Sequence, residues 1–207
     1  MCGRYNLRTS AQVLAEMFHA KADLEVHPRY NIAPTQSSLV CRLDDAGQRE
    51  IVPMRWGLVP SWAKDIKIGY KLINARAETV SEKPSFRAAY KRRRCLVIAS
   101  GFYEWKREGK SKQPFHIHRE DDQPFAFAGL WEYWDQGAIE SFTIITTAAN
   151  SLMVPIHHRM PVLLQPDQYG VWLDQDIAPQ ALEPLLEPYD WKHMQLDPAN
   201  SNVGHEK

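Results

Sequence analysis

The sequence predicts an α+β protein with one β-rich domain over residues 1–207, built on a mostly antiparallel, barrel-like sheet core with peripheral helices. Short apolar runs bounded by turn-forming residues recur along the chain, as is typical of strands. The helical patterns do not alternate with these runs, so βαβ units are not expected. No repeat, low-complexity segment or Gly/Ser-rich linker divides the 207 residues, a length that fits one large domain with its own core.

The N-terminal part of the chain predicts one short helix followed by a loop. Thr9 and Gln12 have the spacing of a capping box, which would open a helix that runs to about His19. Apolar residues at positions 13, 14, 17 and 18 would lie on one side of this helix. Residues 28–34 are bounded by prolines, so an irregular loop is expected there.

The rest of the chain predicts mostly strands. They are expected at 38–43, 51–56, 95–98, 115–118, 124–131, 141–147 and 162–164. Helices are expected around 79–91, near 167–173 and at 179–186.

Composition favours an ordinary globular protein of a reducing compartment. Charged residues make up 24% and hydrophobic residues 44% of the chain, and no apolar run has the length of a transmembrane helix. The N-terminus lacks the apolar region of a signal peptide. The three cysteines are too few for a disulfide framework. We therefore expect a cytoplasmic monomer that has no membrane partner.

Charge is distributed unevenly along the chain. Residues 1–119 contain 22 Lys/Arg and 11 Asp/Glu, whereas residues 120–207 contain 3 and 14. Such asymmetry favours a basic face that binds a polyanion such as nucleic acid. The alternative is that both sets intermingle on a solvated surface.

Cys2 is the most informative residue. Removal of Met1 would leave an α-amine and a thiol on adjacent carbons, and such a 1,2-aminothiol condenses with an aldehyde to an imine and then closes to a thiazolidine. We expect the thiolate to be accessible, because a cation such as Arg4 lowers a thiol pKa. The alternative is that the Met-Cys start has no chemical role.

Four polar segments follow apolar runs and are candidates for function. Asn74 and Arg76 offer an amide and a phosphate-binding guanidinium, although Asn74 alone would be interpreted as a helix cap. Glu104 lies among aromatic residues, so it is either a partly desolvated acid or base or an exposed residue of an alternating strand. His157 is a candidate proton carrier, or a loop histidine bonded to the backbone. The basic run 91–94 is either a phosphate track or a helix end.

Two further patterns were considered. His116 and His118 would share one face of a strand, but no third ligand is marked by spacing, so a metal site is not expected. Most of the tryptophans should be core residues. Trp62 and Trp105 have polar neighbours and are candidates for stacking on unpaired bases.

Six segments form an ordered set along the chain. They are Met1-Cys2-Gly3-Arg4, Arg29-Tyr30-Asn31-Ile32-Ala33-Pro34, Arg55-Trp56-Gly57-Leu58-Val59-Pro60 with Trp62 just beyond, Ile73-Asn74-Ala75-Arg76-Ala77-Glu78-Thr79, Gly101-Phe102-Tyr103-Glu104-Trp105 and His157-x-Arg159-Met160-Pro161. This set resembles the SOS-response-associated peptidase (SRAP) family, and the likeness covers most of the chain.

The resemblance implies a protein that binds single-stranded DNA, removes its own initiator Met and traps abasic sites as a thiazolidine DNA–protein crosslink, which shields the lesion during the DNA damage response. The implied catalytic residues are Cys2 for the crosslink, Asn74 for holding the opened sugar, and Glu104 and His157 for proton transfer. The implied DNA contacts are Arg4, Trp62, Arg76, Trp105 and Arg159, the last at a phosphate. No metal or other cofactor is implied.

The resemblance implies an enzyme that processes its own N-terminus in the manner of a peptidase. It also implies lyase-type imine chemistry in the crosslinking of abasic sites. His158 stands where the family often has Asp, which would alter the charge beside His157. Two alternatives stay open. One is a non-covalent single-stranded DNA-binding module, and the other is a thiol peptidase that acts in trans with Cys2 as nucleophile and His157 as base.

Overall fold

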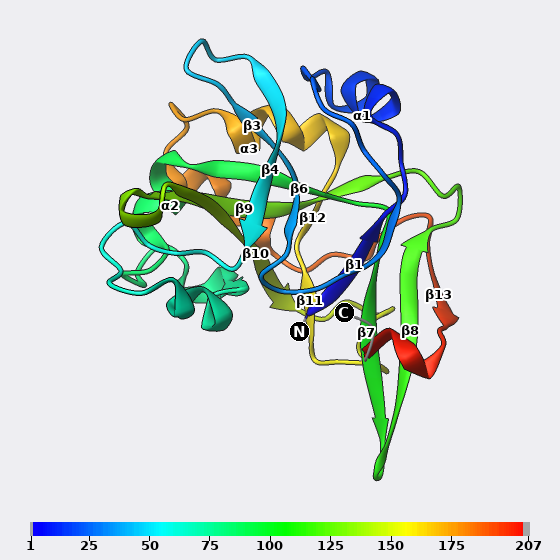
Figure 1. Ribbon diagram of the computed structural model, residues 1–207. Helices are drawn as coiled ribbons and strands as arrows, with labels where there is room; N and C mark the ends of the chain where they lie inside the picture. The colour runs from blue at the N-terminus through cyan, green and yellow to red at the C-terminus, as the bar shows by residue number, and fades with distance from the viewer. Residues whose placement is uncertain (1, 205–207) are drawn as a thin grey trace.

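Five strands close a barrel at the centre of the molecule. The computed structural model describes residues 2–204 (Figure 1). The barrel strands are β3 (Ser37–Leu43), β4 (Arg49–Trp56), β6 (Arg94–Ala99), β9 (Phe125–Trp134) and β10 (Ile139–Ala148). They pair in the order β10-β4-β3-β6-β9, and the pairing of β9 with β10 closes the ring. All pairs in the ring are antiparallel except β4 with β10.

Three short strands extend the barrel sheet. β11 (Arg159–Pro161) pairs with the end of β10, and β12 (Leu163–Leu164) pairs with β9. β5 (Asn74–Arg76) runs parallel to β10. The central strand β10 therefore holds both β5 and β11, which come from distant parts of the sequence.

The second sheet has five strands in the order β13-β8-β7-β1-β2. They are β1 (Arg4–Leu7), β2 (Arg29–Ile32), β7 (Gly101–Glu108), β8 (Ser111–Arg119) and β13 (Met194–Pro198). All of its pairs are antiparallel. In Figure 1 the β7–β8 hairpin extends past the rest of the molecule.

The helices are short and lie around the sheets (Figure 1). The α-helices are α1 (Ala11–Phe18), α2 (Arg87–Arg92), α3 (Tyr169–Leu173) and α4 (Glu183–Leu186). The 3-10 helices are η1 (Ile66–Lys71), η2 (Ala77–Thr79), η3 (Asp135–Gly137), η4 (Pro166–Gln168), η5 (Pro179–Leu182) and η6 (Ser201–Gly204). None of the helices within residues 2–204 has the length and apolar character needed to cross a bilayer.

The main hydrophobic core reaches both sheets. It includes Tyr5 of the second sheet, and Trp56 and Phe127 of the barrel, all of which are fully buried. The ring of Tyr5 meets that of Trp56 edge-on at 5.0 Å and that of Phe127 at 6.2 Å. Because each buried aromatic ring removes a large apolar area from water, these contacts anchor β1 to the barrel.

The predicted class, α+β with a mostly antiparallel barrel-like core, is confirmed, and the barrel strands lie close to their predicted ranges. Three local predictions are wrong. The capping box does not form, because Ser10 caps α1 without a side-chain bond and the Thr9 hydroxyl contacts Ser100 instead. The loop predicted at 28–34 contains β2, which pairs with β1. The helix predicted around 79–91 is reduced to α2, because Pro84 interrupts the helical hydrogen bonding.

Candidate active site

The four predicted catalytic residues come from four separate segments that the two sheets bring together. Cys2 precedes β1, and Glu104 lies on β7, which pairs with β1 through Arg4 and Tyr103. Asn74 opens β5, and His157 lies two residues before β11. Both β5 and β11 pair with β10, so strand pairing sets the separation of Asn74 and His157.

Cys2 is fully buried, and its carbonyl oxygen accepts a hydrogen bond of 3.0 Å from Asn74 Nδ2. Burial raises the pKa of the Cys2 thiol far above its ordinary value, and the nearby Glu104 carboxylate raises it further. The prediction that Arg4 makes the thiolate form of Cys2 accessible is therefore wrong for this structure. The thiol is protonated at neutral pH because the apolar surroundings and Glu104 both oppose a negative charge on sulfur.

Asn74 belongs to a strand, not to a turn. Interpretation of Asn74 as a helix cap is wrong, because it begins β5 and pairs with Ile144 of β10. Its amide group reaches across to the backbone of Cys2. The neutral amide of Asn74, which has both donor and acceptor atoms, thus lies beside Cys2, the residue predicted to form the crosslink.

Glu104 is buried, which excludes the alternative of an exposed strand residue. The backbone N–H of Trp105 donates to Glu104 Oε1 at 3.3 Å. The charge of Glu104 acts on both Cys2 and His157, raising the pKa of the thiol and, in part, that of the imidazole. One carboxylate therefore lies between a nucleophile and a proton carrier.

His157 is held by the backbone of its own turn. His157 Nδ1 lies 3.0 Å from the backbone nitrogen and 3.2 Å from the carbonyl oxygen of Arg159, so the backbone of Arg159 fixes the position of the ring. Burial lowers the pKa of His157, and Glu104 partly offsets this effect. The ring of His158 stacks on that of His157, with centroids 4.4 Å apart. Because the imidazole is mainly neutral near pH 7, it presents one donor nitrogen.

Arg159, predicted as a phosphate contact, is buried and forms a two-pronged ion pair with Glu78. The two N···O distances are 2.6 and 2.9 Å, and the guanidinium also donates to the Thr146 carbonyl at 2.7 Å. Arg159 lowers the pKa of the Glu78 carboxyl. This pair joins the segment after Asn74 to the segment after His157, and the phosphate contact of Arg159 stays a prediction. The sequence analysis did not select Glu78, although it lies in the same segment as Asn74 and Arg76.

The other predicted DNA contacts differ in exposure. Trp62 lies in a turn with 56% of its surface exposed, and Arg76 of β5 is also exposed. Trp105 and Arg4 are half-buried beside Glu104 and Cys2 in the sequence. These four side chains therefore have the accessibility that contact with a ligand requires, and their roles stay predictions.

The basic run 91–94 is a helix end. Lys91 and Arg92 form the last turn of α2, and Arg93 pairs with Glu132 at 2.8 Å. Arg94 is buried, and it donates to the carbonyl oxygens of Trp172 and Tyr90 at 2.6 and 2.8 Å. Two of the four cations thus bond within the protein, which favours the helix-end interpretation.

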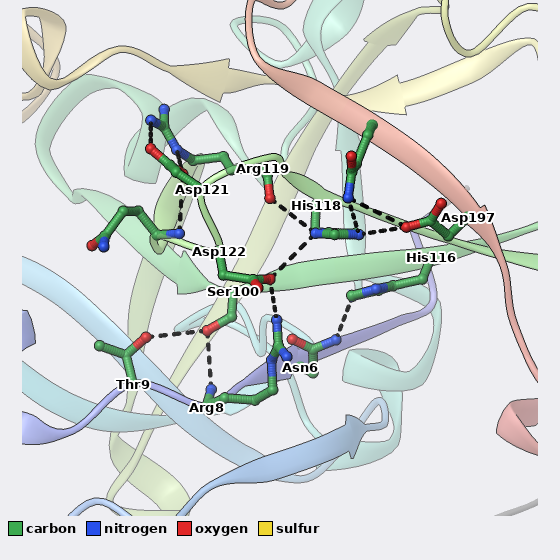
Figure 2. Close-up of polar contacts among 12 residues, drawn as sticks. Asn6, Arg8, Thr9, Ser100, His116, His118, Arg119, Asp121, Asp122 and Asp197 are labelled. Atoms are coloured by element: carbon green, nitrogen blue, oxygen red, sulfur yellow. Dashed lines mark hydrogen bonds and ion pairs between the residues drawn. The ribbon is translucent and has the colours of Figure 1, made fainter.

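A second histidine cluster lies on β8, where His116 and His118 alternate with the buried core residue Ile117 (Figure 2). The rings of His116 and His118 stack with centroids 4.5 Å apart, and His118 Nε2 is 2.9 Å from Asp197 Oδ2. His116 Nε2 lies 2.8 Å from Asn6 Nδ2. A Cβ on Gly101 would lie 2.2 Å from His116 Nε2, so only glycine fits under this ring. Within residues 2–204, no group of three or more His, Cys, Asp or Glu side chains could hold a metal ion.

The site therefore combines a buried thiol, a carboxylate, an amide and a neutral imidazole around the N-terminal segment. A carboxylate accepts protons, and an imidazole donates one when it is protonated. This set of groups suits condensation of an amine with a carbonyl compound, in which a proton must be removed from nitrogen and water must leave.

Comparison with known proteins identifies relatives along the whole chain. Residues 1–206 match the family model described as SOS response associated peptidase (SRAP). The chain is 44% identical over 215 residues to the abasic site processing protein YoqW of Bacillus subtilis, covering all of this chain and 96% of that protein. It is 34% identical to YedK of Escherichia coli, also named an abasic site processing protein, covering 86% of this chain and 82% of YedK.

A solved structure supports the same relationship. A protein of Bacteroides thetaiotaomicron aligns with a TM-score of 0.90 at 28% identity, covering 100% of this chain and 95% of that one. The sequence resemblance is thereby confirmed, and the chain belongs to the SOS response associated peptidase (SRAP) family.

Proposed function

We propose that this protein processes abasic sites in DNA, and that it does so by forming a thiazolidine crosslink through Cys2 after Met1 has been removed. The observation that supports the proposal is that Asn74 bonds to the Cys2 backbone, while the charge of Glu104 acts on both Cys2 and His157. The names of the relatives YoqW and YedK support the lesion as substrate. The DNA is single-stranded, and the protein acts as a cytoplasmic monomer that removes its own initiator Met.

The reaction begins at the amine and not at the thiol. The α-amine of Cys2 attacks C1 of the ring-opened sugar, and Glu104 accepts the proton that the nitrogen loses. His157 donates a proton to the departing sugar oxygen, and loss of water from the carbinolamine leaves an imine. The Cys2 S–H then adds across the C=N bond, with sulfur bonding to carbon and the proton passing to nitrogen. The net change is one water lost.

The state of the thiol favours this order over the trans-acting peptidase. A thiol peptidase needs a thiolate as its first nucleophile, whereas the buried Cys2 thiol has a raised pKa. An imine can form while the sulfur is still protonated, because nitrogen attacks first. The sulfur reacts only in the second step, when its S–H group adds to the imine. The resting protein therefore needs no free thiolate.

Intact mass measurement tests the proposal. The purified protein is measured alone and after mixing with single-stranded DNA that carries one abasic site. We expect a mass lacking Met1, and a denaturation-resistant adduct at the sum of protein and DNA minus one water. Processed protein that binds this DNA without an adduct would support the non-covalent binding module instead, and turnover of a peptide substrate would support the peptidase.

A further inference from the structure

The tip of the β7–β8 hairpin carries an excess of positive charge far from the core. Residues 106–112 include four cations, Lys106, Arg107, Lys110 and Lys112, and one anion, Glu108. Figure 1 shows this tip beyond the body of the molecule. We propose that the tip is a second DNA contact, which binds backbone phosphates on one flank of the abasic site. The inference rests on the proposed function and adds a binding surface to it.

The arrangement of charge at the tip is costly for the free protein. Arg107 of β7 is directly opposite Lys112 of β8 in the strand register, and both are exposed. Like charges directly opposite in a sheet are destabilising. Lys106 is paired with Glu108 at 2.6 Å, and it is the one cation of the tip in an ion pair within the described residues 2–204. A polyanion on this face would relieve the repulsion between Arg107 and Lys112.

Strand β7 connects the tip directly to the candidate active site. Glu104 is buried in the site, and the same strand continues through Trp105 to the turn at Gly109. At about 3.3 Å per residue, the turn lies about 17 Å from Glu104. Since phosphates along one DNA strand follow every ~3.4 Å in a stacked strand, this distance corresponds to about five nucleotides.

The register also places an aromatic residue between the site and the tip. Trp105 pairs with Pro114, and Arg107 pairs with Lys112, so Trp105, Arg107 and Lys112 lie on one face of the hairpin, opposite to the face that carries the Glu104 side chain. Aromatic rings that stack on bases, followed by cations that bind phosphates, are the usual elements of a single-stranded DNA groove. The hairpin leaves the site in one direction, so it reaches only one flank of the lesion.

The test compares two triple variants that remove equal charge. The hairpin variant is Arg107→Gln/Lys110→Gln/Lys112→Gln, and the control is Lys83→Gln/Lys91→Gln/Arg92→Gln, whose three exposed cations lie in and just before α2. Binding and adduct formation are measured on two abasic oligonucleotides, each with a tail of about ten nucleotides on one side only, either 5′ or 3′. Salt dependence is recorded for each.

We expect the hairpin variant to lose about tenfold in affinity for one of the two oligonucleotides, and its salt slope there to fall by about 2, at ~0.7 per phosphate contact. Adduct yield at saturating DNA should be unchanged, and the melting temperature should be equal or higher because the Arg107–Lys112 repulsion is gone. The control should retain wild-type binding to both oligonucleotides.

Other outcomes would overturn the inference. If the hairpin variant matches the control on both DNAs, or loses affinity equally for both, the tip is not a contact for one flank, while an adduct in the wild type would leave the proposed function intact. If the wild-type protein binds neither oligonucleotide, the proposed function fails and the hairpin contact fails with it.

Discussion

The candidate active site and the histidine cluster of Figure 2 use the same kinds of residue with opposite results. Each combines an asparagine, a histidine and a carboxylate, and each involves β1 or its N-terminal extension. In the histidine cluster the polar groups bond to one another, as in Asn6 with His116 and His118 with Asp197. In the candidate active site, Asn74 bonds to the backbone of Cys2 and the Glu104 carboxylate acts on its thiol, which is the proposed reactive group.

The two histidines show what the difference means chemically. His116 has its pKa lowered to about 4, first by burial and then by the charges of His118 and Arg8, so its ring is neutral near pH 7. His157 also has a lowered pKa, but the Glu104 carboxylate opposes the effect of burial. For His157 the Glu104 carboxylate is the largest effect after burial, whereas for His116 the carboxylates of Asp197 and Asp122 act less than the cations His118 and Arg8 that oppose them. His157 therefore stays closer to the range in which a histidine transfers protons.

The largest expected effect is that of Cys2→Ala. Without sulfur no thiazolidine can close, so the denaturation-resistant adduct should be absent, whereas DNA affinity should stay close to that of the wild type. His118→Gln is the matched change in the histidine cluster, and its adduct yield should equal that of the wild type. Gel analysis after denaturation measures the adducts, and fluorescence anisotropy measures DNA affinity. A stable adduct in the Cys2→Ala protein would refute the proposed chemistry.

Glu104→Gln should slow adduct formation by about 100- to 10,000-fold, because a general base contributes that much to a proton-transfer step. The amide keeps the size of the side chain in a buried position, so folding should be preserved. Asp197→Asn, the corresponding carboxylate change on β13, should leave the rate unchanged. Single-turnover rates on abasic DNA make the comparison, and equal rates for the two variants would remove Glu104 from the mechanism.

The fold was largely predictable because the barrel strands are apolar. Strands such as β6, in which every residue is buried, leave an apolar run in the sequence. β1 and β13 were missed because they are short and polar, and they form only by pairing with β7 and β8. Such strands depend on the partner and not on their own residues, so periodicity does not predict them.

The site was predictable in composition but not in geometry. The sequence indicates the segments that contain Asn74, Glu104 and His157, but not their arrangement. The pairing of β7 with β1 places Glu104 near Cys2, and the pairing of β5 and β11 with β10 positions Asn74 and His157. The phosphate contact of Arg159 stays a prediction, and the protein contacts of this residue could not be predicted. Its guanidinium suits a phosphate, yet in this structure it binds Glu78 and Thr146, which no spacing rule relates to it. Likewise, burial raises the pKa of Cys2, an effect that sequence proximity to Arg4 did not predict.

His157→Gln should have an effect that depends on pH. The pKa of His157 in the folded protein lies below its ordinary value, so the protonated fraction grows as pH falls below about 6.5. The α-amine loses reactivity over the same range in both proteins, so the ratio of wild-type to variant rates isolates the imidazole. We expect this ratio to increase from pH 7.5 to pH 5.5. A ratio that is constant with pH would show that His157 transfers no proton in the slow step.

The smallest effect concerns stability and belongs to the histidine cluster. His116 binds a proton with a pKa of about 6.5 when unfolded but about 4 when folded, so the unfolded state takes up more protons between these values. The free energy of unfolding should therefore decrease as pH falls from about 6.5 to about 4. The facing groups Arg8, His118, Asp122 and Asp197 remain in place in His116→Gln, whose amide oxygen can still accept from Asn6.

Urea denaturation of the wild type and His116→Gln at pH 7 and pH 5 measures this contribution. The variant should be less stable at pH 7, because its amide packs less well on His118 and Tyr103 than the ring does. It should also lose less stability than the wild type on going to pH 5. His27→Gln, at an exposed histidine, should change neither quantity. If His116→Gln keeps the wild-type pH dependence, another group limits stability in acid, and the neutral state of His116 is not what separates this cluster from the active site.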